Sequence, residues 1–364
     1  MSLQCGIVGL PNVGKSTIFN AITRAGAQSA NYPFCTIEPN VGRVDVPDTR
    51  LTKLSDIVKP KNVVPAAMEF VDIAGLVEGA SKGEGLGNQF LSHIRETEAV
   101  AHVVRCFTDD NIIHVRGKVS PADDIRIINL ELILADLDSL EKQIQKIEKK
   151  AKSGDKVEKA RFDLAAKIRD HLNEEKPLRT MSLSDDEKAI AKTFALITAR
   201  PMLYVMNMDE ASASSGNEYT AIVEKIAAEE GAPTVRLCGR TEEEIAALSP
   251  EEAQEYLSSL GLEESGLARM IRASYTLLNL LTYFTAGEVE VRAWTVTKGA
   301  TAPEAAGVIH SDIQRGFIRA EVMSCDDIFK LGSQQAVKDA GKMRLEGKDY
   351  IVQDGDVCYF RFNV

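Results

Sequence analysis

The chain has 364 residues, of which 44% are hydrophobic and 27% are charged, and its formal net charge is −11. This length and composition allow two or three domains with apolar cores and exclude wholesale disorder. The negative charge argues against a general nucleic-acid-binding protein, which is normally basic, so any contact with RNA must be local.

Neither the cysteines nor the histidines form a recognisable cluster. The six cysteines have no Cys-x-x-Cys spacing, and the five histidines are isolated. We therefore predict reduced thiols rather than disulfides or a zinc site. No run of eighteen apolar residues occurs, and the first residues read as a strand rather than a signal sequence. We expect a cytoplasmic monomer that has no membrane segment.

The most informative stretch is the segment 9–17, Gly-Leu-Pro-Asn-Val-Gly-Lys-Ser-Thr. It follows a short apolar strand at 5–8 and opens a helix, which is the context of the G-x-x-x-x-G-K-[ST] phosphate-binding loop (P-loop). Backbone N–H groups and the helix N-terminus favour a triphosphate there. We predict that Lys15 is catalytic and neutralises the β- and γ-phosphates, and that Ser16 binds Mg²⁺. The predicted phosphate contacts are Asn12, Val13, Gly14, Lys15, Ser16 and Thr17.

Three further residues fit a nucleotide-hydrolysing switch. Asp72 ends an apolar strand at 67–71 and is placed to hold Mg²⁺, and the N–H of Gly75 is placed to meet the γ-phosphate. Thr36, between these two motifs, is the candidate to complete the Mg²⁺ shell. Asn12 is a candidate ligand for a monovalent cation such as K⁺.

The motifs do not directly identify the side chain that orients the attacking water. The residue after Gly75 is Leu76, which cannot polarise water, so another side chain must serve. His114 is the best-placed candidate and is assigned as catalytic on that ground. A lone histidine is more often structural, and that alternative stays open.

From about residue 121 to 199 the chain is charged, helical and nearly free of glycine. Apolar residues recur at helical spacing, which predicts an antiparallel helical hairpin or coiled coil, and Ser184 with Glu187 predicts a capped third helix. The spaced positions are Ile127, Leu130, Leu134, Leu137, Leu140, Ile144, Ile147, Leu164, Ile168 and Leu172. Residues 141–170 hold ten Lys or Arg and six Asp or Glu, so this arm is either a solvated face or a basic surface for RNA or a partner.

A buried strand at 202–206 resumes the α/β pattern and leads into Asn207-Met208-Asp209-Glu210. GTPases carry Asn-Lys-x-Asp at this point, and its last Asp accepts two hydrogen bonds from guanine. Here the lysine is replaced and the final carboxylate is one methylene longer, which favours ATP over GTP. The predicted base contacts are Asn207, Met208, Glu210, Cys238 and Gly239.

The C-terminal part, 278–364, reads as α+β. A strand at 289–294, a helix capped by Thr301 and Glu304, and a hairpin around Asp354-Gly355 are predicted. The expected organisation is a P-loop domain with a doubly wound, mostly parallel sheet (1–120 and 200–277), an inserted helical coiled-coil domain (121–199) and the C-terminal domain (278–364).

These motifs together resemble the YchF (Obg-like ATPase) family. The resemblance is carried by the segments 9–17, 32–40, 72–77, 207–210, 292–296 and 305–312. It implies that the C-terminal segment is a TGS domain of ubiquitin-like β-grasp fold. It also implies a preference for ATP, a catalytic histidine on a mobile loop (by position His114), and association with the ribosome and its large subunit.

Two other functions remain open on the sequence. One is a GTPase that acts in ribosome assembly, which differs from the ATPase only in its choice of base. The other is an RNA-binding scaffold gated by nucleotide, in which hydrolysis is incidental. A small-molecule kinase is poorly supported because the chain shows no motif for a second substrate.

Overall fold

The computed structural model describes residues 4–29, 40–73, 86–115, 117–152 and 155–363. The chain divides into two compact units, one formed by Met1–Arg43 with Glu69–Ser274 and the other by Val44–Met68 with Tyr275–Val364. The sequence placed 44–68 in the P-loop domain, whereas the structure groups this segment with the C-terminal residues.

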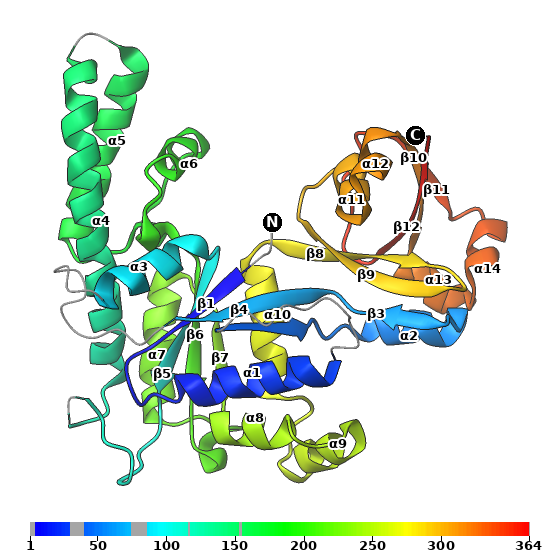
Figure 1. Cartoon of the computed structure of the whole chain (residues 1–364), viewed down its shortest axis with the longest axis horizontal. Helices are drawn as coiled ribbons and strands as arrows, with labels where there is room; N and C mark the ends of the chain where they lie inside the picture. Colours follow the sequence, from blue (N-terminus) through cyan, green and yellow to red (C-terminus); the bar gives the residue numbers. More distant parts are fainter. Residues whose placement is uncertain (1–3, 30–39, 74–85, 116, 153–154, 364) are drawn as a thin grey trace. The chain divides into compact units, whose positions relative to one another are not determined.

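A six-stranded sheet forms the centre of the first unit, in the order β2-β4-β1-β5-β6-β7 (Figure 1). β4, β1, β5, β6 and β7 pair in parallel. Every residue of β5 and β6 is buried, as expected for central parallel strands that are covered on both faces. The strands are β1 (Gln4–Val8), β2 (Val41–Asp45), β4 (Ala67–Asp72), β5 (Ala99–Arg105), β6 (Met202–Asn207) and β7 (Thr234–Leu237).

Helices alternate with these strands, which confirms the predicted α/β class. α1 contacts β1 and α8, and α7 contacts β6, β7 and α4 (Figure 1). The helices are α1 (Lys15–Ser29), α3 (Leu86–Glu96), α7 (Glu218–Glu230), α8 (Gly239–Ile245), α9 (Pro250–Ser259) and α10 (Gly266–Leu277). This arrangement leaves the carboxyl ends of β1, β4 and β6 to carry loops, which is where α/β proteins bind ligands.

Residues 121–199 form the predicted helical hairpin. It consists of α4 (Pro121–Ala151) and α5 (Lys156–Asn173), followed by α6 (Asp185–Lys192), whose capping box joins Ser184 and Glu187 as expected. The hairpin core contains Leu140, Ile144, Ile147, Leu164, Ile168 and Leu172. Leu134 is a correction, since it is 40% exposed. Near its start α4 also packs on β5 and α7, so its buried stripe there runs through Ile128 and Leu132 instead.

A histidine is buried in the centre of the first sheet. His102 on β5 has no solvent exposure, and its ring lies 5.5 Å from that of Tyr204. Neither ring nitrogen has a hydrogen-bond partner among the described residues. Burial, helped by the charge of Arg179, lowers the pKa of His102 to about 3. The folded chain therefore holds this imidazole neutral.

Because the pKa of His102 is lower in the folded chain than in the unfolded chain, the unfolded state binds a proton first as pH falls. Stability should therefore decrease as pH drops from about 6.5 towards 3, and His102 should account for about 2 kcal/mol between pH 7 and pH 5. The check is the free energy of unfolding at both pH values for the wild type and for His102→Phe. An equal loss in the two proteins would contradict this assignment.

The second unit contains a mixed sheet in the order β11-β10-β12-β8-β9-β3. β8 and β9 form an antiparallel hairpin, and β12, the last strand, lies beside β8 in parallel. α11 packs against β9 and β10. A last strand placed in the middle, parallel to the first, with a helix crossing the sheet, is the strand order of the ubiquitin-like β-grasp fold, as expected. The strands are β3 (Asn62–Val64), β8 (Leu280–Ala286), β9 (Glu290–Thr297), β10 (Phe317–Ser324), β11 (Arg344–Glu346) and β12 (Asp356–Phe362).

The helices of this unit are α2 (Thr49–Val58), α11 (Ala302–Ile309), α12 (Ser311–Arg315), α13 (Cys325–Leu331) and α14 (Gln334–Asp339). The predicted cap of α11 by Thr301 and Glu304 is present. The hairpin around Asp354-Gly355 is wrong. β12 pairs instead with β10 and β8, and the Asp354 carboxylate accepts a hydrogen bond from the N–H of Thr282.

Residues 44–68 are held in the second unit by pairing and by charge. β3 pairs in parallel with β9, and the Arg50 guanidinium contacts both Asp48 and Asp354. These carboxylates raise the pKa of Arg50 further above its ordinary value against the opposing effect of burial. No local pattern in the sequence predicts that residues 44–68 pack with the C-terminal residues. In the described part of the chain no helix is long and apolar enough to cross a membrane.

Candidate functional site

The P-loop joins β1 to α1 as the sequence predicted. Asn12 and Gly14 have φ values of 61° and 89°, so the backbone turns through the left-handed region on both sides of the buried Val13. α1 then starts at Lys15, with the N–H of Ile18 bonded to the carbonyl of Gly14. Its N-terminus therefore opens at the carboxyl end of β1, which is a favourable position for an anion.

Asn207 braces this loop from the end of β6. Its Nδ2 donates to the Val13 carbonyl at 2.8 Å, and its Oδ1 accepts from the N–H of Gly239 at 2.9 Å. A Cβ at Gly14 would lie 2.0 Å from Nδ2 of Asn207, so only glycine fits there. The sequence predicted Asn207 as a base contact. The structure places its side chain, 5% exposed, between the P-loop and the Cys238-Gly239 turn.

The structure brings the predicted phosphate and metal residues to one edge of the sheet. The Lys15 ammonium pairs with the Asp72 carboxylate, which lies at the end of β4 opposite Ile7 of β1. Ser16 is exposed in the first turn of α1. Thr36 and Gly75, predicted to complete this site, lie outside the described residues.

The loop after β6 explains the altered base motif. The carboxylate of Asp209 accepts a hydrogen bond from the N–H of Ser212 and so caps a short helix at Glu210–Ser212. Met208 is 2% exposed and its N–H is bonded to the Leu237 carbonyl. Glu210 is exposed. One oxygen of Asp209, the aspartate nearest the expected guanine-binding position, is thus engaged in its own turn.

These loops border a cleft of about 860 Å³, large enough for a nucleotide. Its wall also includes residues that were not predicted from the sequence, in the loop after β5 and in α8. Those additional residues are Phe107, Thr108, Asp109, Ile112, Arg240 and Glu243. Their place in the chain could have indicated them, because ligands in parallel α/β sheets bind beyond the carboxyl ends of the strands.

Arg105 fixes the loop after β5. It is 1% exposed, and its guanidinium donates to the carbonyls of Phe107, Asp109 and Ile112 at 3.1, 3.3 and 3.0 Å. The same group lies 4.5 Å from the centre of the Phe107 ring. This wall of the cleft is therefore built around one buried cation.

His114 does not line the cleft. Its ring is buried, and Nε2 lies 3.0 Å from Oδ2 of Asp124 in the first turn of α4. The residue before it is close to the P-loop, since Nδ2 of Asn12 donates to the Ile113 carbonyl at 3.0 Å. The backbone of the candidate histidine is thus attached to the phosphate loop, while its side chain is turned to the helical hairpin.

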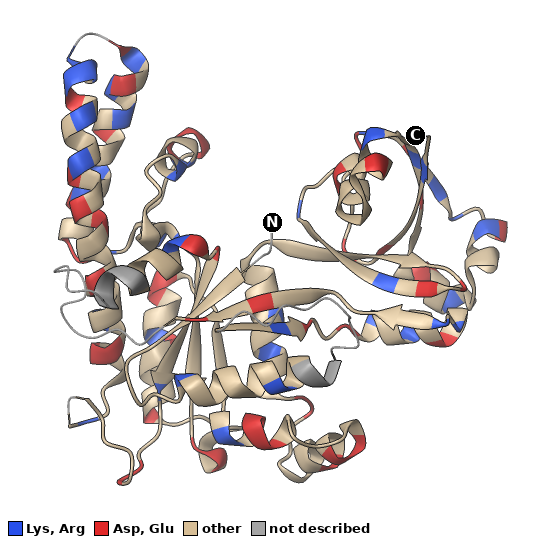
Figure 2. Ribbon diagram, in the orientation of Figure 1, with Lys and Arg blue, Asp and Glu red and all other residues tan. Residues whose placement is uncertain are grey.

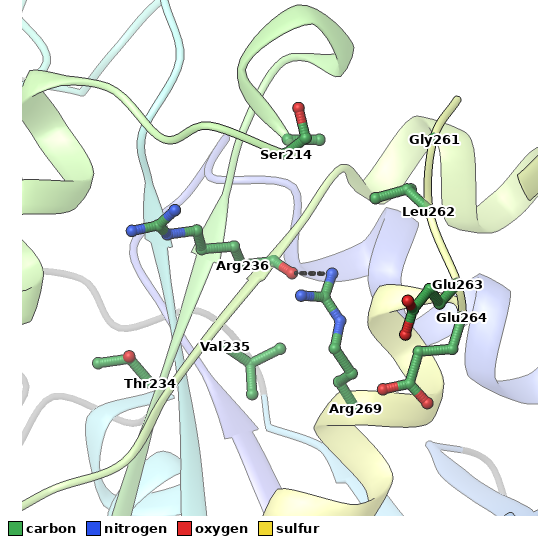
Figure 3. Close-up of a pocket in the computed structure, with 10 residues that line it drawn as sticks. Ser214, Thr234, Val235, Arg236, Gly261, Leu262, Glu263, Glu264 and Arg269 are labelled. Atoms are coloured by element: carbon green, nitrogen blue, oxygen red, sulfur yellow. Dashed lines mark hydrogen bonds between the residues drawn. The ribbon is translucent and has the colours of Figure 1, made fainter. Parts of the chain in front are cut away.

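A second hollow in the same unit has a different character. It measures about 580 Å³ and is bordered by Arg236, Arg269, Glu263 and Glu264 (Figure 3). Most of these charges are engaged nearby, since Arg236 pairs with Glu224, Glu264 pairs with Arg272, and Arg269 donates to the backbone carbonyl of Arg236. This hollow has no P-loop, and the first N–H groups of the adjacent α10 are bonded to the Glu242 carboxylate, so the cleft remains the candidate nucleotide site.

Comparison with known proteins agrees with this geometry. Residues 4–208 match the family model described as "50S ribosome-binding GTPase", and residues 280–363 match that of the YchF-GTPase C-terminal region, described as a "Protein of unknown function". A "Ribosome-binding ATPase YchF" of Bacillus subtilis is 57% identical over 366 residues, which cover all of both chains. The chain belongs to the YchF family.

Other members of the YchF family extend this match. The "Ribosome-binding ATPase YchF" of Escherichia coli O157:H7 is 58% identical over 364 residues, again covering both chains completely. A solved structure of the Schizosaccharomyces pombe YchF GTPase superposes with a TM-score of 0.91 at 40% identity, covering 99% of this chain and 98% of that one. The whole architecture, including the helical insertion, is therefore shared within the family.

Proposed function

We propose that the chain is a Mg²⁺-dependent ATPase that acts as a nucleotide-controlled switch on the ribosome, in the cytoplasm. The observation that carries the choice of ATP is the loop after β6. The Asp209 carboxylate is bonded to the N–H of Ser212, and Met208 replaces the lysine of a guanine-binding motif. Relatives that match over the full length of the chain are named ribosome-binding ATPases, which supports the same reading.

The residues present fit Mg²⁺ held together with a triphosphate. Among the described residues no three His, Cys, Asp or Glu side chains are grouped as a metal cage. Ser16 and Asp72 offer one hydroxyl and one carboxylate, which is the sparse oxygen set that Mg²⁺ uses when phosphates and water supply the other ligands. Bound there, the ion would neutralise charge on the phosphates. Thr36 is proposed as a further ligand.

Within this proposal Lys15 binds the β- and γ-phosphates, and the N–H of Gly75 meets the γ-phosphate. Asn12 is proposed to assist a K⁺ ion through its side-chain oxygen, since its nitrogen is bonded to Ile113. The base is proposed to lie against Met208, Glu210 and Cys238, all of which border the cleft. His114 is proposed to orient the attacking water.

The role of His114 is tested by His114→Ala. We expect kcat for ATP to fall about 100-fold, at the low end of what a positioned acid or base supplies, and KM to stay nearly constant. The measurement is steady-state phosphate release with Mg²⁺. His310, whose side chain is 63% exposed in the second unit, provides the matched control as His310→Ala. Equal kcat values in both variants would contradict the role.

The hairpin of α4 and α5 is the proposed contact with ribosomal RNA, because lysines and arginines, interspersed with fewer acidic residues, lie along residues 141–170 (Figure 2). Replacing Lys149, Lys150 and Lys152 with alanine should weaken co-sedimentation with ribosomes. It should also flatten the dependence of binding on salt by about one unit of slope for each phosphate that the variant no longer neutralises. Lys152 pairs with Glu148 at 2.7 Å, so it must leave that carboxylate to contact a phosphate.

A charge-matched control for the hairpin replaces three exposed lysines elsewhere in the first unit: Lys188, Lys192 and Lys225. The control variant should sediment with ribosomes as the wild type does. Unchanged binding of the hairpin variant, or equal losses in both variants, would show that the hairpin is not the contact surface.

A further inference from the structure

The segment between β5 and α4 is fixed near its start by a buried arginine and turns at a glycine near its end. Arg105 fixes residues 107–112 through three carbonyls. Further on the chain turns at Gly117, which has a φ of 74° and no contact within 4 Å of where a Cβ would stand among the non-adjacent residues that the structure describes. The part that carries His114 is therefore bounded by a rigid anchor before it and a glycine turn after it.

The contact between His114 and Asp124 is unusual for a purely structural pair. Asp124 is 1% exposed, and of its two buried oxygens only Oδ2 is bonded, at 3.0 Å from Nε2 of His114. Oδ1 has no hydrogen-bond partner among the described residues. Burial raises the pKa of the Asp124 carboxyl, and the bond to His114 opposes that rise. A buried carboxylate oxygen that has no partner among the described residues is costly, so a structural role alone gives little reason for this pairing.

The two aliphatic side chains next to His114 are exposed to solvent, whereas the polar imidazole between them is buried. Ile113 is 78% exposed and Val115 is 58% exposed, whereas the imidazole between them is 6% exposed. The present conformation therefore leaves two aliphatic side chains in solvent while it buries the imidazole. The Ile113 carbonyl is bonded to Asn12, so the stretch that carries His114 already lies beside the P-loop.

We propose that Asp124 is a positioning residue that holds His114 away from the nucleotide, and that each turnover requires His114 to leave Asp124 and turn towards the phosphates. This inference rests on the proposed role of His114. If Asp124 restrains His114 in this way, basal ATP hydrolysis is slow, because only molecules in which His114 has left Asp124 can hydrolyse ATP.

The test is the substitution Asp124→Asn, which removes the charge at constant size. We expect kcat for ATP to rise about tenfold with KM unchanged within twofold, because a larger fraction of His114 is released. In the His114→Ala background the same substitution should change nothing. Asp123→Asn is the matched control, since it removes an exposed charge from the same helical turn without touching His114.

Each result separates the two proposals. A lower kcat for Asp124→Asn would overturn the proposed restraint of His114 by Asp124 (the latch) and would make Asp124 an activator of His114. The same change in kcat with and without His114 would reduce Asp124 to a structural role. An unchanged kcat for Asp124→Asn, with His114→Ala impaired, would overturn the latch alone, whereas an active His114→Ala protein would overturn both.

A measurement on the wild type guards against misfolding of the variants. Carbethoxylation by diethyl pyrocarbonate, followed by mass spectrometry, should modify His114 at least about tenfold more slowly than His310, whose side chain is 63% exposed. In Asp124→Asn the rate at His114 should approach that at His310. Equal modification rates at His114 and His310 in the wild type would show that His114 is not held in its buried position beside Asp124.

Discussion

Replacing Lys15 with alanine should lower kcat/KM for ATP by about 10³-fold, the largest effect on activity that we expect from a single side chain. Lys15 is the first residue of α1, and its ammonium is the cation of the P-loop. This ammonium is paired with the Asp72 carboxylate. The alanine variant loses the charge that opposes the phosphates and leaves Asp72 unpaired in the same cleft. Phosphate release measured across ATP concentrations gives the value.

Two further substitutions control this experiment. Lys15→Arg keeps the charge but replaces a compact ammonium with a planar guanidinium, so it should also be strongly impaired. Lys342→Ala removes a lysine paired with Asp327 in the second unit and should retain full activity. A Lys15→Ala protein within threefold of the wild type would show that the P-loop lysine does not act on the phosphates.

Replacing Gly14 with alanine should have the largest effect on stability, lowering the free energy of unfolding by about 2–5 kcal/mol. The added Cβ would meet Nδ2 of Asn207 at 2.0 Å in a backbone with a φ of 89°. The side chain of Asn207 must then release the Val13 carbonyl, the Gly239 N–H or both. Nucleotide binding should be lost together with the brace.

Gly231→Ala isolates the backbone part of this effect. Gly231 caps α7 with a φ of 66° and has open space where a Cβ would stand, so alanine there brings strain without a clash. We expect a loss of about 1 kcal/mol and unchanged nucleotide binding. Chemical denaturation of both variants, with calorimetry for nucleotide, makes the comparison. Equal losses would mean that the contact with Asn207 contributes nothing.

What the sequence could predict was encoded in neighbouring residues. The P-loop, the strand ending at Asp72, the α4–α5 hairpin and the cap at Ser184 each depend on spacing within a few residues, and each is present. The order of the C-terminal strands followed from the family resemblance rather than from spacing. Asp72 was predicted as a Mg²⁺ ligand, and the structure places it beside Lys15 because β4 and β1 are adjacent parallel strands.

What the sequence could not predict depends on contacts far apart in the chain. The Asn207 amide reaches Val13 across 194 positions, so its role as a brace was not visible in the Asn-Met-Asp-Glu motif. The exchange of 44–68 into the second unit depends on β3 meeting β9. His114 was identified as a candidate, but only the packing of α4 shows that its ring contacts Asp124.

The choice of base is the most direct test of the account. Calorimetric titration of the Mg²⁺-loaded protein with a non-hydrolysable ATP analogue, and separately with its GTP counterpart, measures it without relying on turnover. We predict at least tenfold tighter binding of the ATP analogue, about 1.4 kcal/mol, because Met208 replaces the lysine of the guanine-binding motif and the longer Glu210 stands where that motif has its final aspartate. Tighter binding of the GTP analogue would contradict the account and favour the assembly GTPase.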